Sequence, residues 1–302
     1  MRDKNLTIVV LAYNSANIIE QCLINLNFDK YKVVVVDNAS RDNSVEFVRK
    51  NFPKVEIIKI PKNIGYGRGN NVALEQVNTE FALVLNPDAI ILEEDIEIVL
   101  EEMRKNPAVA MAGPVILGKY PLDQNEARSE IAKIEENFLA SKNDYRAKLD
   151  DNFVARFLVG AALFMKVSIM KKIGFFDKEI FLYYEDNEIC QRVEVNNYKN
   201  ILVPSAFAFH IAGKSCGSCV RITYKKSWHQ TWSKLHWMEK TQNSFSTKCE
   251  ALKLSFRHFE KILLSFITFN KKRSAQNLGA FCGALAFLIG LKAFKKNDEA
   301  RG

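Results

Sequence analysis

The chain has 302 residues, of which 48% are hydrophobic and 26% are charged. This is the composition of a globular protein with a sizeable core, and it excludes a disordered chain, a collagen-like fibre and a polytopic membrane protein. The net charge of +8 is unevenly spread, because residues 1–210 carry 26 Lys and Arg against 30 Asp and Glu, whereas residues 211–302 carry 17 against 5. We therefore expect an acidic body with a basic extension that faces phosphates or anionic lipid.

The first apolar run, about six residues long, is shorter than the apolar region of a signal peptide. It predicts a first buried strand and a cytoplasmic protein with free thiols. Cys216 and Cys219 form a C-x-x-C pair. A structural zinc site needs a second Cys or His pair nearby, so this pair is not interpreted as a metal site.

Up to about residue 120, β-rich runs alternate with amphipathic stretches. Strands are predicted at residues 7–11, 32–36, 55–60, 81–85 and from 108, and helices from Ile18, after Asp42, at 70–77 and at 93–105. This alternation predicts an α/β fold with a mostly parallel central sheet flanked by helices. Ligands of such sheets lie beyond the carboxyl ends of the strands, so the residues that follow each strand are the first candidates for a site.

The second half of the chain has a different pattern. Residues 121–152 are polar and are interpreted as a mobile excursion, and core-like sequence resumes at 153–165. Beyond about residue 220 the chain is expected to be mainly helical. We therefore divide it into a main domain over 1–215 and a basic, helical extension over 216–302.

A charge-free run of 14 residues, 278–291, lies in this extension between Lys271–Arg273 and Lys292. It is too short to span a bilayer comfortably, since that takes roughly 20 residues. A basic-flanked helix in the membrane interface is the favoured interpretation, and a packed core helix is the alternative. The surface that would meet an anionic membrane is placed at residues 252–302.

Candidate ligand-binding residues follow each of the first four predicted strands. They are Ala12, Tyr13 and Asn14 after the first strand, Asp37 after the second, Asn63, Gly65 and Arg68 after the third, and Asn86 and Asp88 after the fourth. Asp37 is suited to accept hydrogen bonds from a pyrimidine N–H or from ribose hydroxyls, and Asp88 is a hard oxygen ligand for Mg²⁺ or Mn²⁺. Each aspartate has a plainer alternative as a turn residue.

The glycines at 65, 67 and 69 do not form a dinucleotide fingerprint. The last position of G-x-G-x-x-G falls on Asn70, and the motif belongs in the first βα turn, which has no glycine here. This argues against a dinucleotide-binding dehydrogenase. A glycine loop still lets the backbone approach a phosphate closely, and Arg68 is suited to hold that phosphate, with a surface salt bridge as its alternative.

Three acidic residues begin a predicted helix within Gly174–Arg192, namely Glu185, Asp186 and Glu188. Acidic side chains stabilise a helix N-terminus, which is one explanation for them. The aromatic residues just before them would bury a carboxylate, raise its basicity and suit it to act as a general base. Farther on, His210 ends an apolar strand, where it is suited to ligate a metal or to pack as a structural histidine.

These residues fall into an ordered pattern. The matching stretches are 9–15, 35–44, 63–71, 83–89, 113–114, 160–164, 174–192 and 210–215. In this pattern the chain resembles the family 2 glycosyltransferases with the GT-A fold, and among them the rhamnosyltransferase-like branch of bacterial surface polysaccharide synthesis. The resemblance covers residues 5–215 and none of the C-terminal extension.

The resemblance implies roles for individual residues. Asp37 corresponds to the aspartate that binds the base or ribose, and Asp186, beside Glu185, corresponds to the catalytic base. Asn86-Pro87-Asp88 stands where many relatives have Asp-x-Asp. Asp88 is then the remaining metal ligand, and His210 completes the metal site as in some relatives.

The resemblance further implies an inverting transferase that moves a sugar, with rhamnose favoured, from a nucleoside-diphosphate donor to a hydroxyl of a lipid-linked glycan. Residues 1–120 would bind the nucleotide sugar and residues 121–215 the acceptor. The implied cofactor is Mg²⁺ or Mn²⁺, and the implied location is the inner face of the plasma membrane. No nucleic-acid partner is expected, because no nucleic-acid motif accompanies the basic extension.

Three alternatives remain beside this interpretation. One is a transferase of the same fold with another hexose donor. A sugar nucleotidyltransferase would have a loop rich in glycine and lysine early in the chain, whereas the first loop here is Ala12–Ser15. A degenerate binding protein would not need Asp37, Asp88, Asp186 and His210 together.

Overall fold

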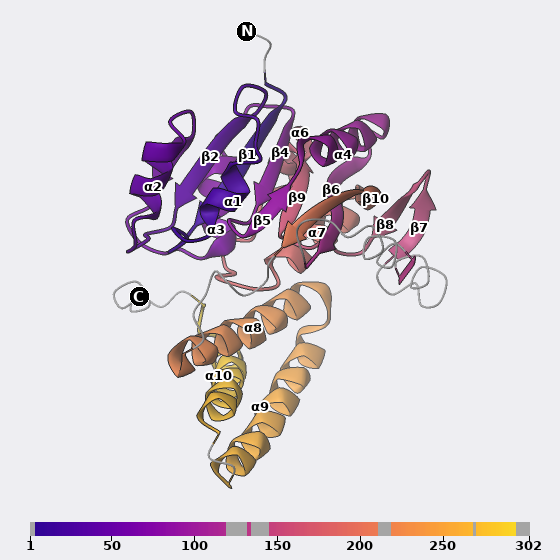
Figure 1. Ribbon diagram of the computed structural model, residues 1–302. Coiled ribbons are helices and arrows are strands. Elements are labelled where there is room, and N and C mark those ends of the chain that lie inside the picture. Colours follow the sequence, from indigo (N-terminus) through magenta and orange to yellow (C-terminus); the bar gives the residue numbers. More distant parts are fainter. Residues whose placement is uncertain (1–3, 119–131, 134–144, 211–218, 268–269, 294–302) are drawn as a thin grey trace. The chain divides into compact units, whose positions relative to one another are not determined.

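The computed structural model describes residues 4–118, 132–133, 145–210, 219–267 and 270–293. The chain forms two compact units (Figure 1). The sheet unit comprises residues 1–63, 69–176 and 189–215, and the helical unit comprises residues 64–68, 177–188 and 216–302. The predicted domain boundary at 215 lies outside the described residues and stays a prediction, and the family match at residues 211–215 lies there as well.

The elements of the chain follow one another in this order. The strands are β1 (Leu6–Ala12), β2 (Lys32–Asp37), β3 (Glu56–Lys59), β4 (Phe81–Leu85), β5 (Ala89–Ile91), β6 (Val109–Leu117), β7 (Tyr145–Leu149), β8 (Asn152–Ala155), β9 (Ala162–Lys166) and β10 (Lys199–His210). The helices are α1 (Ile19–Leu23), α2 (Ser44–Asn51), α3 (Tyr66–Leu74), α4 (Glu93–Lys105), α6 (Val167–Ile173), α7 (Glu185–Val195), α8 (Val220–Thr241), α9 (Ser244–Ile267) and α10 (Lys271–Leu288).

The sheet unit is built on one sheet with the order β3-β2-β1-β4-β9-β6-β10-β8-β7. The first four strands in this order are parallel. Strands β1 and β4 are buried along their whole length, which explains why they are continuous apolar runs without alternation. The predicted α/β fold with a mostly parallel sheet flanked by helices is confirmed.

Antiparallel strands complete the sheet. β9 lies between β4 and β6 and is antiparallel to both, and β5 and β8 are antiparallel to β10. The sequence predicted core-like residues at 153–165 but not the direction of a strand, because the apolar pattern is the same in both directions. The polar excursion predicted at 121–152 lies mostly outside the described residues, but its end forms β7 and enters β8.

The prediction that the third helix begins at Asn70 is wrong. Helix α3 begins at Tyr66, so two of the three glycines lie inside the helix and not in a loop. One of them has a packing reason, because a Cβ on Gly69 would come 2.6 Å from Cδ1 of Leu11. A side chain there would push the helix away from the sheet.

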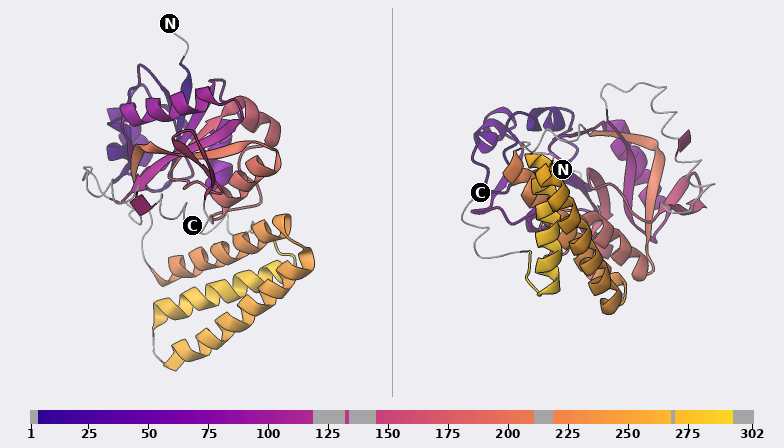
Figure 2. Two further views of the ribbon diagram at one scale, coloured as in Figure 1. Left: turned by 90° about the vertical axis from the view of Figure 1, so that its right-hand side faces the viewer. Right: turned by 90° about the horizontal axis from the view of Figure 1, so that it is seen from below.

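The C-terminal helices α8, α9 and α10 pack side by side in the helical unit (Figures 1 and 2). Helix α10 approaches α8 closely through glycines. A Cβ on Gly279 would come 2.3 Å from the carbonyl oxygen of Tyr224, and one on Gly283 would come 2.5 Å from that of Trp228. Glycine is required at both positions because backbone lies in the way.

The charge-free run 278–291 therefore has two faces. Its small residues are buried in the bundle, as the packed-helix alternative predicts, whereas Leu278, Leu285 and Ile289 are exposed. Among the residues described, none of the helices has both the length and the apolar character that crossing a membrane requires.

Candidate active site

The loops that follow β1, β2 and β3 are tied together at the carboxyl edge of the sheet. Ala12 at the end of β1 is in register with Asp37 at the end of β2. The backbone N–H of Asn38 donates to the carbonyl of Ala12 at 2.8 Å. The side chain of Asn38 in turn donates to Oδ1 of Asn63 at 3.2 Å. The structure thus brings three of the predicted donor-binding residues together.

Asp37 is only 2% exposed, and its Oδ1 accepts a hydrogen bond from the backbone N–H of Ser40 at 3.0 Å. The turn role that the sequence offers as an alternative is therefore present in the structure. It occupies one oxygen of the carboxylate, and a carboxylate has several acceptor positions. Binding of a base or ribose by Asp37 stays a prediction.

Asn14 connects the first two loops. Its backbone N–H donates to Oγ of Ser40 at 2.9 Å, and its Oδ1 accepts from the backbone N–H of Arg41 at 2.8 Å. Its φ of +52° is a left-handed conformation that asparagine tolerates better than most residues. The neighbouring Tyr13 donates its backbone N–H to Oγ of Ser15 at 3.2 Å. These residues shape the loop edge, and their contact with a donor stays a prediction.

Asp42 follows the second predicted strand and starts the predicted helix, and it lies at this edge as expected. Its Oδ2 accepts from the backbone N–H of Ala16 at 3.0 Å, and its Oδ1 accepts from both the backbone N–H and the hydroxyl of Ser44. Asp42 also joins that helix, α2, to the loop after β1.

Asp88 and His210 lie side by side although 122 positions separate them. β5 follows Asp88 directly and pairs with the end of β10, with Ala89 in register with His210. Nε2 of His210 lies 3.1 Å from Oδ1 of Asp88 and 3.5 Å from Nδ2 of Asn86. The predicted pair of metal ligands is therefore brought together by strand pairing.

A carboxylate oxygen and an imidazole nitrogen are suitable ligands for Mn²⁺ and, on the carboxylate side, for Mg²⁺. Across the part of the chain that the structure describes, no group of three or more His, Cys, Asp or Glu is arranged to hold a metal ion. Two protein ligands fit a metal whose other positions are filled by phosphate oxygens and water. Asp88 and His210 thus fit a metal that arrives with a nucleotide.

Gly65 belongs to the helical unit, where it packs on the turn before α7. Its φ is +89°, and a Cβ there would come 2.4 Å from the carbonyl oxygen of Phe181. That oxygen accepts from the backbone N–H of Tyr66 at 2.8 Å. This contact explains the glycine without a phosphate, and the donor-binding roles of Gly65 and of Arg68, in the first turn of α3, stay predictions.

The three acidic residues lie in the first turn of α7, as predicted. Glu185 and Glu188 are buried, whereas Asp186 is partly exposed. Burial, together with the charge of Asp186, raises the pKa of Glu185 to about 8. Oε2 of Glu185 has no hydrogen-bond partner among the described residues. At neutral pH Glu185 is therefore mostly protonated, while its neighbour Asp186 is partly open to solvent.

This division assigns different chemistry to the two neighbours. A general base must be ionised when it takes a proton, so the partly exposed Asp186 is better suited to that role than the buried Glu185. In the sequence, burial of an acid beside aromatic residues was the argument for a general base. In the structure this burial acts on Glu185, raises its pKa and keeps it mostly protonated at neutral pH.

The raised pKa of Glu185 predicts a loss of stability as the pH rises. Between the ordinary pKa near 4.5 and the folded value of about 8, unfolding releases a proton, so the free energy of unfolding falls with pH. The slope for one group is on the order of 1 kcal/mol per pH unit. Denaturant unfolding between pH 5 and about 8 should show a shallower fall for Glu185→Gln, and equal slopes for the two proteins would contradict the buried, neutral carboxyl.

The model of the family Glycosyl transferase family 2 matches residues 7–174. The chain belongs to this family. Among its relatives, this glycosyltransferase is 26% identical over 202 residues to "Low-salt glycan biosynthesis hexosyltransferase Agl10" of Haloferax volcanii, with 64% of this chain and 62% of the relative covered. It therefore spans less than two thirds of that relative. It is also 23% identical over 239 residues to an N-acetylglucosaminyl-diphospho-decaprenol L-rhamnosyltransferase of Mycobacterium tuberculosis, with 70% of this chain and 78% of the relative covered.

Solved structures show the same fold. A mannosyltransferase from Pyrobaculum calidifontis, solved with GDP-Man and Mn²⁺, has a TM-score of 0.58 at 17% identity over 95% of this chain and 87% of its own. TarS 1-349 of S. aureus has a TM-score of 0.52 at 15% identity, with 95% of this chain and 92% of its own covered. The glycosyltransferase therefore has the GT-A fold.

Proposed function

We propose that the enzyme is an inverting glycosyltransferase that moves a sugar from a nucleoside-diphosphate donor to a hydroxyl of a lipid-linked glycan in cell-surface polysaccharide synthesis. The observation that carries the proposal is the placement of two neighbouring acids in the first turn of α7, where Glu185 is buried and Asp186 is partly exposed. A single displacement needs one ionised base near the acceptor, and a second nucleophilic carboxylate has no part in it.

In this reaction the carboxylate of Asp186 takes the proton of the acceptor hydroxyl. The acceptor oxygen forms its bond to the anomeric carbon as the bond from that carbon to the diphosphate breaks. The electron pair of the broken bond leaves with the diphosphate. Attack from the face opposite the leaving group inverts the anomeric centre.

On the donor side, Asp37 accepts hydrogen bonds from the base or ribose, and Asp88 and His210 would hold Mg²⁺ or Mn²⁺. When bound, such a metal neutralises charge on the leaving diphosphate. Arg68 adds a second positive charge for the same phosphates. The mannosyltransferase of the same fold was solved with a nucleotide sugar and Mn²⁺, which supports a metal-dependent donor site here.

Rhamnose is the favoured sugar, because relatives include the mycobacterial L-rhamnosyltransferase and the rhamnosyltransferase WbbL of Escherichia coli. The test is a screen of nucleotide sugars by thermal shift and by donor hydrolysis, with Mn²⁺, with Mg²⁺ and with EDTA. We expect dTDP-rhamnose to raise Tm and to be hydrolysed only with a metal present. If another hexose donor is turned over instead, that hexose and not rhamnose is the transferred sugar. Binding of donors without any turnover would identify a degenerate binding protein.

The mycobacterial relative is named for an acceptor linked to decaprenol through a diphosphate, which supports a lipid-linked acceptor for this enzyme. A second feature supports work at a membrane. Helix α9 exposes apolar side chains at a helical spacing, and we name these residues the α9 stripe: Leu252, Phe256, Phe259 and Leu263, with exposed fractions of 58%, 67%, 46% and 54%. An exposed apolar stripe on a strongly basic segment is typical of a helix that binds an anionic membrane surface.

Removing the two aromatic residues of the α9 stripe should release the protein from anionic vesicles. Full burial of a phenylalanine is worth about 1.5–3 kcal/mol, so Phe256→Ser with Phe259→Ser should weaken binding at least about tenfold. The measurement is co-sedimentation with phosphatidylglycerol vesicles at low and high salt. Ile24→Ser is the matched control, because Ile24 is 66% exposed but lies outside the extension.

Two results would contradict the membrane assignment. One is equal vesicle binding by the double variant and by the Ile24→Ser control. The other is self-association of the wild-type chain that depends on the α9 stripe, because the stripe would then be covered by a second copy of the chain.

A further inference from the structure

One face of α8 contacts the turn that leads into the carboxylates of α7. The turn comprises residues 177–184, and both it and α8 belong to the helical unit. Five residues of α8 contact the turn, and their spacing of mostly three or four positions places them on one side of the helix. They are His229, Ser233, His236, Trp237 and Lys240.

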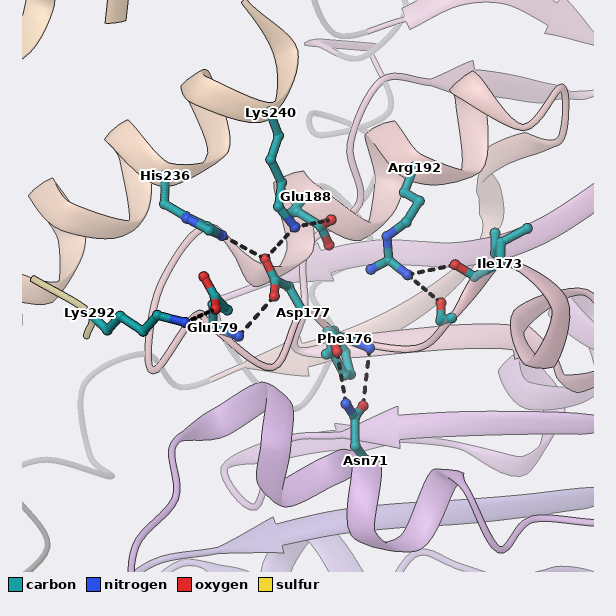
Figure 3. A network of polar contacts seen from close by, with 11 residues as sticks. Asn71, Ile173, Phe176, Asp177, Glu179, Glu188, Arg192, His236, Lys240 and Lys292 are labelled. Carbon is teal, nitrogen blue, oxygen red and sulfur yellow. Dashed lines mark hydrogen bonds and ion pairs between the residues drawn. The ribbon is translucent and has the colours of Figure 1, made fainter. Parts of the chain in front are cut away.

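Asp177, at the start of the turn, receives the strongest of these contacts (Figure 3). Its Oδ2 accepts from Nζ of Lys240 at 2.6 Å and from Nε2 of His236 at 2.9 Å, and its Oδ1 accepts from the backbone N–H of Glu179 at 2.8 Å. Burial alone would raise the pKa of Asp177, but these hydrogen bonds outweigh burial and hold the pKa well below its usual range. Asp177 is therefore a permanently charged anchor.

Further contacts fasten the end of the turn. Oγ of Ser233 donates to the carbonyl of Leu182 at 3.0 Å. Nζ of Lys240 also lies 3.4 Å from Oε1 of Glu188, in the first turn of α7. Lys240 thus joins Asp177, at the start of the turn, to Glu188 in helix α7, which follows the turn.

The turn needs this support because its backbone is strained. Tyr183 and Tyr184 both have left-handed conformations, with φ of +68° and +64°. Residues with side chains avoid this region, and such conformations persist where the surrounding contacts over-determine the backbone. Two of them in succession, directly before Glu185 and Asp186, set the direction in which α7 begins.

We propose that Lys240 and His236 are positioning residues for the general base Asp186. They act through Asp177 and Glu188 and hold the strained turn and the first turn of α7 in place. The inference rests on the proposed function, in which Asp186 takes the acceptor proton. It gives the C-terminal extension a part in the reaction itself, beyond attachment to a membrane.

A plainer explanation is that these contacts only stabilise the helical unit. Lys234, on the same helix, allows the two explanations to be separated. Its Nζ makes an ion pair of 3.2 Å with Oε1 of Glu250 on α9, which lies within the three-helix bundle. Removing this ion pair tests the contribution of an α8 lysine to stability without touching the turn.

The experiment compares Lys240→Met, Lys240→Arg and Lys234→Met in the full chain by kcat for sugar transfer, donor Kd and Tm. Misplacing a catalytic group by about 1 Å costs up to about 100-fold in rate, so Lys240→Met should lower kcat by about 10- to 100-fold. Donor Kd should stay near the wild-type value. Lys240→Arg should retain most of the wild-type kcat. Lys234→Met should keep wild-type kcat even if its Tm falls by as much as that of Lys240→Met.

A Lys240→Met enzyme with wild-type kcat would overturn the inference, as would an equal loss of kcat in Lys234→Met. If Lys240→Met does not fold, His236→Phe decides in its place. Phenylalanine keeps the ring stacked on Trp232, where the ring centroids are 5.0 Å apart, and removes the hydrogen bond to Asp177. A loss of kcat at unchanged donor Kd supports the inference, and wild-type kcat overturns it.

The proposed function fails by different results. It fails if the wild-type enzyme transfers no sugar, or if Asp186→Asn keeps its activity. The positioning role alone fails if the wild-type enzyme and Asp186→Asn behave as expected while Lys240→Met, or His236→Phe where Lys240→Met does not fold, keeps wild-type kcat.

Discussion

Replacing Asp186 by asparagine is expected to lower kcat for sugar transfer by about 10²- to 10⁴-fold, the usual contribution of a general base. Asparagine keeps the size of the side chain but does not take a proton at neutral pH. Donor affinity should be close to that of the wild type, because the proposed donor ligands are other residues. The measurement combines steady-state transfer kinetics with direct binding of the donor.

Glu185→Gln is the informative comparison for this variant. Burial already keeps Glu185 protonated at neutral pH, and glutamine reproduces that neutral form in size and charge. The Glu185→Gln enzyme should therefore retain a much larger share of kcat than the Asp186→Asn enzyme. If Glu185→Gln loses more kcat than Asp186→Asn, Glu185 is the base and Asp186 is not. If Asp186→Asn keeps wild-type kcat, Asp186 is not the base.

The two neighbouring carboxyls also show where sequence reasoning stops. The sequence predicted that aromatic residues bury one acid at the start of a helix, and the structure confirms that helix and a buried acid. The pattern did not tell which acids are buried, and the structure buries Glu185 and Glu188 but leaves Asp186 partly exposed. The burial argument and the family resemblance point to different residues of this pair, because Glu185 is buried and Asp186 is partly exposed.

Parallel strands made the donor side easier to predict. The carboxyl ends of such strands meet at one edge, so the residues after β1 and β2 were expected to be neighbours, and Ala12 and Asp37 are in register. The contact of Asp88 with His210 arises differently, from the antiparallel pairing of β5 with β10. The family resemblance supplied that pair, because strand order across the second half of the sheet has no sequence period.

The basic extension is the feature that the structure changes most. Charge counting predicted a surface for phosphates or lipid, and several of its lysines instead form ion pairs within the helical unit. Lys234 pairs with Glu250, Lys292 pairs with Glu179, and Lys240 bridges Asp177 and Glu188. Composition counts such lysines as free charge, since it cannot show which acids fold back onto them. Under the proposed function, lysines near the α9 stripe would meet the membrane.

Replacing Asp88 by asparagine is expected to remove most of the metal dependence of donor binding. Hard cations such as Mg²⁺ and Mn²⁺ depend on carboxylate charge, and asparagine keeps the shape and the amide oxygen but loses that charge. Even changes outside the direct ligands cost 10- to 100-fold in metal affinity, so loss of the ligand charge should cost at least about tenfold. The measurement is calorimetric binding of UDP, GDP and dTDP, with Mn²⁺ and with EDTA.

Asp95→Asn is the matched control for this change. Asp95 is a partly buried aspartate of the sheet unit, and its Oδ1 accepts from the backbone N–H of Phe207 on β10 at 2.9 Å. This variant has the same change in charge next to the same strand, so it should keep the wild-type ratio of affinities with and without metal. If Asp88→Asn keeps that ratio as well, Asp88 holds no metal, and its contact with His210 then serves to join the end of β4 to the end of β10.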